Sequence, residues 1–80
     1  MGLPPVRVEI PEPAYMALLK GLAKGSKVNA RLTTAEYGAR RGKAFYIFTG
    51  SRAEALLLRA LALSHARAIV PAIDRALKAT

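Results

Sequence analysis

The sequence predicts a two-layer α+β domain with the element order β-α-β-β-α, in which helices pack on one face of a three-stranded, mostly antiparallel sheet. Three observations point to this fold class. Apolar and charged residues alternate near the start, a basic turn-like segment separates two further strand-like runs, and an apolar helix-forming segment follows. Strands and helices mixed in this way are typical of small α+β domains. The 80 residues are expected to form one domain, residues 1–80, with a small core.

The first strand is expected at residues 6–10, where apolar residues alternate with Arg7 and Glu9 as in a half-buried strand. Pro11 ends it, because proline cannot donate a hydrogen bond to the neighbouring strand. A helix is expected over residues 13–25. Its apolar stripe has the i, i+3, i+4, i+7 spacing of an amphipathic helix and consists of Tyr15, Leu18, Leu19 and Leu22.

Residues 6–26 resemble the opening of a ribbon–helix–helix protein. In that family the strand reads the major groove of DNA as part of a dimer, so the resemblance would imply DNA contacts from Arg7 and Glu9. The chain departs from the family at residues 27–48, where two further strands are expected instead of an immediate second helix. We therefore do not assign Arg7 and Glu9 as DNA readers.

Two more strands are expected at residues 27–33, which alternate, and at residues 43–49, which carry apolar side chains on both faces. The second is predicted to be the central, covered strand. Residues 34–43 are interpreted as a hairpin connection in which Gly38 and Gly42 supply positive φ angles. The alternative is a short helix, because Thr33 and Glu36 have capping-box spacing.

The last element is a long helix that begins at Arg52. Ser51 as the N-cap and Glu54 three residues later form a capping box directly before an apolar run. The helix is expected to continue at least to Ala68 and to be kinked or broken near Pro71, because proline lacks the N–H of the helical ladder and crowds the preceding turn.

This long helix is apolar on two sides. One side should lie on the sheet and consists of Leu58, Leu61, Ala62, Ile69 and Ile73. The other repeats every seven residues and consists of Leu56, Leu63, Val70 and Leu77. A small monomer would expose that second line as an unusual apolar patch. We therefore predict a homodimer through it, with coverage by the first helix as the alternative.

The net charge of +8, from 13 Lys and Arg against 5 Asp and Glu, attracts polyanions. The sequence therefore favours a non-catalytic, regulatory or nucleic-acid-binding protein. DNA or RNA is expected to contact Arg40, Arg41 and Lys43 at the hairpin, with Arg31 and Lys27 on the neighbouring strand. The alternative is an assembly module that meets an acidic protein partner and dimerises through the long helix.

Several kinds of chemistry are not expected. The absence of cysteine excludes disulfides, thiolate nucleophiles and Cys-ligated zinc. His65 has no second histidine or acid at metal-ligand spacing, and the surroundings of Ser51 are not those of a nucleophile elbow. No phosphate-loop motif occurs. We expect no enzyme activity, no metal and no cofactor.

The location is expected to be cytoplasmic. Residues 1–10 contain two prolines and lack the unbroken apolar run of a signal peptide. Residues 53–70 are apolar but include Glu54, Arg59 and Arg67, so they are not expected to cross a membrane. A single Asn and no Gln or Cys are typical of heat-adapted proteins, so we also expect thermostability.

Overall fold

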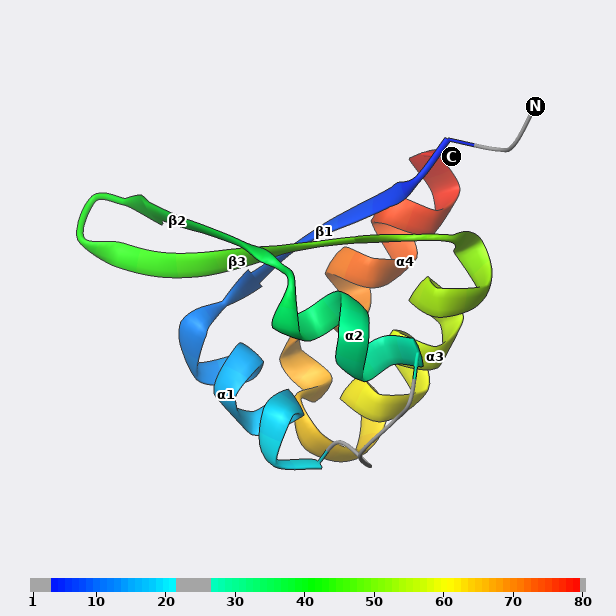
Figure 1. Cartoon of the computed structure of the whole chain (residues 1–80), viewed down its shortest axis with the longest axis horizontal. Helices are drawn as coiled ribbons and strands as arrows, with labels where there is room; N and C mark the ends of the chain where they lie inside the picture. The colour runs from blue at the N-terminus through cyan, green and yellow to red at the C-terminus, as the bar shows by residue number, and fades with distance from the viewer. Residues whose placement is uncertain (1–3, 22–26, 80) are drawn as a thin grey trace.

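A computed structural model of the chain describes residues 4–21 and 27–79 and confirms the predicted fold class. Helices pack against a three-stranded antiparallel sheet, and the hairpin of β2 and β3 projects beyond them (Figure 1). In chain order the elements are β1 (Val6–Pro11), α1 (Glu12–Gly21), α2 (Lys27–Thr33), β2 (Glu36–Arg40), β3 (Lys43–Gly50), α3 (Arg52–His65), the 3-10 turn η1 (Arg67–Ile69) and α4 (Val70–Ala79).

The strand order is β1-β3-β2, so β3 is the central strand, as predicted. Both pairs are antiparallel, with Val8 opposite Phe48 and Tyr37 opposite Tyr46. Because side chains alternate across a strand, one face of the sheet is apolar and meets the helices. The core between the layers contains Val6, Val8, Ile10, Tyr15, Leu18, Leu32, Phe48, Ala55, Leu58, Ala62, Ile69, Ile73 and Leu77.

Tyr15 of α1 joins the sheet layer to the helical layer. Its ring stacks on that of Tyr46 with the centroids 3.8 Å apart. Its buried hydroxyl donates a 2.7 Å hydrogen bond to the carbonyl oxygen of Leu32 in α2. Tyrosine is suited to this position because a buried hydroxyl needs a partner while the ring adds apolar contact. The N-terminal helix predicted for residues 13–25 is confirmed as far as Gly21 and begins one residue earlier, at Glu12, while residues 22–25, including Leu22, lie outside the described residues.

The predicted strand at residues 27–33 is wrong: this segment is the helix α2. Val28 and Leu32 are four residues apart in sequence. This spacing puts two residues on the same face of a strand and also on the same side of a helix, so a segment of seven residues fits both periods. The end of α2 is held by Thr33 and Thr34, whose hydroxyls donate to helix carbonyls, Thr34 to Ala30 O at 2.8 Å. The missing strand is supplied by residues 36–40 instead.

Residues 34–43 include a hairpin turn and not the alternative short helix, but the segment is not a mere connection as predicted, because residues 36–40 form the strand β2. The turn contains only Arg41 and Gly42, whose φ angles are 53° and 79°, which is the pattern of a type I′ turn. Gly38 does not supply a positive φ as expected, because it lies within β2. A Cβ there would be 2.6 Å from two ring carbons of Phe45, so glycine is required for the ring to lie across the strand.

The capping box at α3 is confirmed, with Ser51 N–H donating to Glu54 Oε1 at 2.8 Å and Glu54 N–H donating to Ser51 Oγ at 3.1 Å. The helix breaks near Pro71 as predicted, but α3 already ends at His65 and not at or beyond Ala68. Pro71 is the second residue of α4 and has no N–H for the carbonyl of Arg67. The chain therefore turns through η1 before α4 starts.

Polar contacts hold α3 and α4 together as a helical hairpin. Arg59 Nε lies 2.7 Å from Asp74 Oδ1, and Arg52 donates to the carbonyl oxygen of Leu77 at 3.2 Å. The Asp74 partner raises the pKa of Arg59, and Arg59 lowers the pKa of Asp74. Across residues 4–21 and 27–79, none of the helices combines the length and the apolar character needed to cross a membrane.

Candidate functional site

The sheet face that points away from the helices is polar at its margins and apolar along β3. The register brings Glu9 opposite Ile47 and Gly38 opposite Phe45 on this side. We call it the open face; it consists of Arg7, Glu9, Pro11, Glu36, Gly38, Arg40, Lys43, Phe45, Ile47 and Thr49. Phe45 and Ile47 are only partly buried. The open face therefore offers an aromatic and an aliphatic side chain between charged residues.

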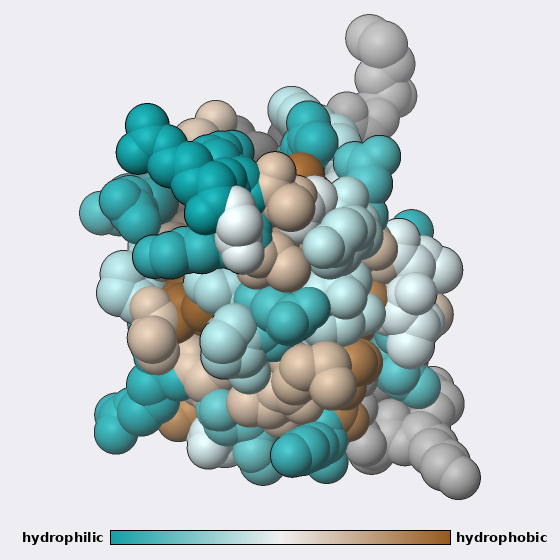
Figure 2. Space-filling model, turned by 90° about the vertical axis from the view of Figure 1, so that its left-hand side faces the viewer, coloured by the Kyte–Doolittle hydropathy of each residue, from teal (hydrophilic) through white to brown (hydrophobic). Residues whose placement is uncertain are grey.

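The hairpin tip, defined as residues 40–43, carries the predicted cations Arg40, Arg41 and Lys43, all of them exposed. Viewed from this end of the molecule, hydrophilic side chains gather in the upper part, at the height where the hairpin projects (Figure 2). Within residues 4–21 and 27–79, the side chains of Arg41 and Lys43 have no ion-pair or hydrogen-bond partner. Their charges are available to an external anion.

Arg40 differs from the other two cations because it already has neighbours. Its Nη2 lies 3.3 Å from Glu9 Oε1, and its guanidinium carbon lies 5.2 Å from the centroid of the Phe45 ring. Both side chains of the ion pair are largely exposed, at 68% and 48%, so the pair contributes little to stability. An incoming phosphate could exchange with the Glu9 carboxylate at low energetic cost.

Next to the hairpin tip lies a hollow of about 280 Å³. We call it the tip hollow. Pro11 and Phe45, which are paired across β1 and β3, supply apolar lining, while the charged lining consists of Glu9, Arg40, Arg41 and Lys43. Three positive charges and one negative charge give this lining a net charge of +2. The arrangement suits a ligand that is flat or apolar in one part and anionic in another.

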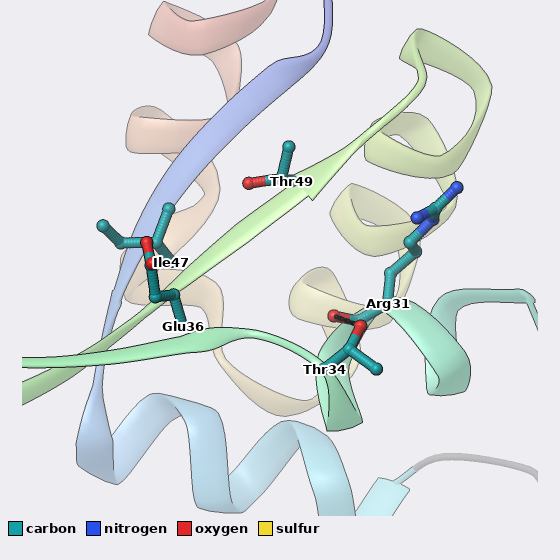
Figure 3. A pocket seen from close by; sticks show the side chains of 5 residues that line it. All are labelled: Arg31, Thr34, Glu36, Ile47 and Thr49. Carbon is teal, nitrogen blue, oxygen red and sulfur yellow. Dashed lines mark hydrogen bonds between the residues drawn. The ribbon is translucent and has the colours of Figure 1, made fainter.

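The other two cations predicted for the site, Arg31 and Lys27, are not on a strand next to the tip. Both belong to α2, and the side chain of Lys27 lies outside the described residues. Arg31 Nε donates to Glu54 Oε2 at 2.8 Å. In Figure 3 the Arg31 side chain extends away from Glu36 towards the start of α3. Arg31 is therefore at the opposite end of β3 from the hairpin tip.

Glu54 explains why Arg31 is held there. The Ser51 N–H and the Arg31 guanidinium both donate to its carboxylate, and together they lower the pKa of Glu54 to about 2. The carboxylate also occupies the N-terminal end of α3, where an external anion would otherwise be attracted.

A second hollow of about 340 Å³ lies nearby on the open face and is lined by Arg31, Thr34, Glu36, Ile47 and Thr49 (Figure 3).

The four residues predicted as a dimer interface do not form one line, because the helix is broken between α3 and α4. Leu77 is only 8% exposed and belongs to the core, and Val70 is partly buried and packs against the core. Leu56 and Leu63 remain exposed on α3, at 49% and 41%. Dimerisation itself stays a prediction, now with a different set of candidate contacts.

Those contacts form what we call the leucine face of α3. It includes Leu57, which is 51% exposed and was not predicted. Two exposed alanines share this helix side at the 3-4 spacing, Ala53 before Leu56 and Ala60 between Leu57 and Leu63. The leucine face consists of Ala53, Leu56, Leu57, Ala60 and Leu63.

Sequence reasoning also missed Glu9 and Pro11, which are distant in sequence from the hairpin but line the same hollow. The alternation that places Glu9 on the polar side of β1 is visible in the sequence. Its neighbour Arg40 depends on the β1-β3-β2 order, which the sequence pattern does not specify. The outward alternation of Lys43, Phe45 and Ile47 along β3 was a usable signal for the open face.

The described residues contain no group of three or more His, Cys, Asp or Glu side chains that could hold a metal ion. His65 is exposed at the end of α3 and its ring packs directly over Gly21, which gives it a local packing contact between α3 and α1. The chain matches no protein-family model, and no curated protein or solved structure is significantly similar to it.

Proposed function

We propose that this protein is a non-catalytic nucleic-acid-binding protein that contacts its ligand through the hairpin tip. One observation carries the proposal: Arg41 and Lys43 are exposed on a projecting β-hairpin, beside the aromatic ring of Phe45. Cations that extend from a compact body can reach phosphates without a clash between the body and the nucleic acid. The net charge of +8 increases the rate of encounter with a polyanion.

The backbone at Arg41 supports this proposal. A φ of 53° is an energetically unfavourable backbone conformation for an L-amino acid with a Cβ atom. Type I′ turns favour Asn or Gly at such positions. Arginine therefore reduces the stability of the turn relative to these residues. A strained residue that persists at an exposed site is an observation from which a functional role can be inferred.

The test compares two double variants with the same change in charge. Arg41→Ala with Lys43→Ala removes two positive charges from the hairpin tip, and Arg67→Ala with Arg75→Ala removes two exposed positive charges from the helical layer. Fluorescence anisotropy with labelled single- and double-stranded oligonucleotides at low salt measures the affinity of each protein. We expect the tip variant to lose most of its affinity and the helical-layer variant to retain most of it.

Equal losses in the two variants would show that binding depends on net charge alone and would contradict a site at the tip. Undetectable binding of the wild-type protein to every oligonucleotide would contradict the proposed function itself. In that case the same cations would be better explained by an acidic protein partner.

A second candidate function, self-assembly, is favoured by the leucine face. We propose that a second copy of the chain covers it. Alanines and leucines share this helix side in the order Ala53, Leu56, Leu57, Ala60 and Leu63. An antiparallel two-fold pairing would place the leucines of one copy against the alanines of the other, so the face is complementary to itself. Nucleic-acid binding and assembly are compatible, since the leucine face does not include the hairpin tip.

Sedimentation equilibrium tests this arrangement. We expect the wild-type protein to be a dimer at micromolar concentration and Leu63→Glu to be a monomer, because the introduced charge would be buried without a partner. Met16→Glu is the matched control, since Met16 is as exposed as Leu56, at 49%, but lies on α1. A monomeric wild-type protein, or dissociation by Met16→Glu to the same extent as by Leu63→Glu, would contradict this proposal.

A further inference from the structure

The lining of the tip hollow distinguishes between kinds of nucleic acid. A duplex presents phosphates and base edges, and its base faces are stacked inside the helix. The cations of the hairpin tip alone could bind the phosphate backbone of a duplex, and the apolar surface beside them would contact no base face. In a single strand the base faces are accessible, and proteins bind them by stacking on aromatic side chains. Phe45 is such a side chain.

The ring of Phe45 is held in a defined place. It lies across Gly38, where a Cβ would come within 2.6 Å of two of its carbon atoms, and its strand neighbour on the β1 side is Pro11. The Arg40 guanidinium lies over the ring, 5.2 Å from its centroid, so a base that stacks there takes the place of this guanidinium, which then leaves Glu9 for a phosphate. Phe45 is nevertheless only partly buried and lines the tip hollow. A ring that is fixed before binding loses little conformational freedom when a ligand stacks on it.

The size and charge of the hollow restrict the ligand further. About 280 Å³ is slightly below the range of about 300–1,000 Å³ that is typical of drug-sized ligand pockets, so the hollow suits one planar group. The cations Arg41 and Lys43 belong to the same lining, where they can bind anions attached to that group. A planar, apolar-faced group that carries an anion on each side is an unpaired nucleotide within a strand.

We propose that the tip hollow binds an unpaired base of single-stranded nucleic acid, stacked on Phe45, while Arg41 and Lys43 hold the adjacent phosphates. The inference rests on the proposed function and specifies its ligand. Glu9 opposes the binding of phosphate but already pairs with Arg40 at 3.3 Å. The lining therefore keeps a net charge of +2.

The experiment uses three labelled probes of equal length: oligothymidylate, an abasic strand with the same sugar-phosphate backbone, and a duplex. Base stacking predicts that the wild-type protein binds oligothymidylate roughly 5- to 160-fold more tightly than the abasic strand. Phe45→Leu keeps an apolar side chain but removes the ring, so it should abolish this preference while its affinity for the abasic strand stays unchanged. Phe45→Tyr retains an aromatic ring and should retain the preference.

The abasic strand also reports on folding, because a misfolded variant would lose its phosphate contacts as well. Equal affinity of the wild-type protein for oligothymidylate and the abasic strand would overturn the inference. So would a loss of affinity for both strands in Phe45→Leu, which would mean that the ring only supports the fold. In both cases the proposed function would survive, whereas it would fail if none of the three probes bound at low salt.

Discussion

Arg41 links the stability of the hairpin to its proposed function, and the replacement Arg41→Asn separates the two. With a φ of 53°, Arg41 is in a region that costs an L-amino acid about 1–2 kcal/mol. Asparagine tolerates this region because its side chain can hydrogen-bond locally, and Asn-Gly is the preferred sequence of a type I′ turn. We expect Arg41→Asn to recover about half of that cost, or about 0.5–1 kcal/mol.

Thermal unfolding followed by circular dichroism measures the gain. For a domain of this size, 1 kcal/mol corresponds to a change in Tm of about 4–8 °C, so we expect an increase of about 2–8 °C. The same variant should bind nucleic acid more weakly, because one phosphate contact is lost. For a single strand each contact contributes about 0.7 to the slope of log affinity against log salt concentration, and the slope should become shallower by that amount.

Arg41→Ala is the matched control for this prediction. Alanine removes the same charge but is not suited to a positive φ, so it should weaken binding without raising the Tm. If Arg41→Asn has a Tm equal to or below that of the wild-type protein, the turn is not strained and the argument from the backbone is refuted. If it is more stable but binds nucleic acid as tightly as the wild-type protein, Arg41 makes no phosphate contact.

Three further replacements test the ion pairs and the core. Glu54→Gln should lower the free energy of unfolding, measured with urea, by about 1 kcal/mol at neutral pH. The pKa of Glu54 is lowered from 4.5 to about 2. The difference in stability between the two proteins should therefore be present above pH 4.5 and disappear as the pH falls towards 2. Tyr15→Phe removes the 2.7 Å hydrogen bond to Leu32 O and should cost about 1 kcal/mol in the same assay; no change would show that the bond is not stabilising. Glu9→Gln removes the negative charge next to Arg40 and should raise nucleic-acid affinity about two- to fivefold. It should change the free energy of unfolding by less than about 1 kcal/mol. An unchanged or lower affinity would contradict the proposed exchange of Glu9 for phosphate.

The elements that the sequence predicts well are those whose signal is local. β1 alternates strictly, β3 carries apolar residues on both faces, and the capping box of Ser51 and Glu54 marks the start of α3. Each signal lies within a few neighbouring residues and needs no knowledge of the rest of the fold. The break before Pro71 is local as well, although its position at Ala66 depends on how α4 packs back against α3 through Arg59 and Asp74.

The errors arise where the decisive interaction is between distant residues. Residues 27–33 fit a strand and a helix equally well, and the buried position of Leu32 against α1 and the sheet favours the helix. Arg31 was assigned to the nucleic-acid site because of its charge, but Glu54, which is 23 residues away, binds it. Leu77 fits the heptad line but belongs to the core once α4 folds back.

Only the part of the candidate site that lies within one segment of the sequence could be predicted. The cations of the hairpin tip are neighbours in sequence, and a turn between two strands exposes them wherever the hairpin lies. Their neighbours Glu9 and Pro11 come from the first strand and reach the site only through the β1–β3 pairing. Sequence alone therefore identified the charges but not the hollow beside them.

The salt dependence of the affinity for single-stranded oligothymidylate tests the central claim most directly. If Arg41 and Lys43 contact phosphates, with or without Arg40, the two or three contacts predict a straight line of log affinity against log salt concentration, with a slope between about −1.4 and −2.1. Binding that is measurable at low salt and weakens with this slope is the result that we expect. No binding at low salt, or an affinity that does not change with salt, would contradict the claim that the hairpin tip binds nucleic acid.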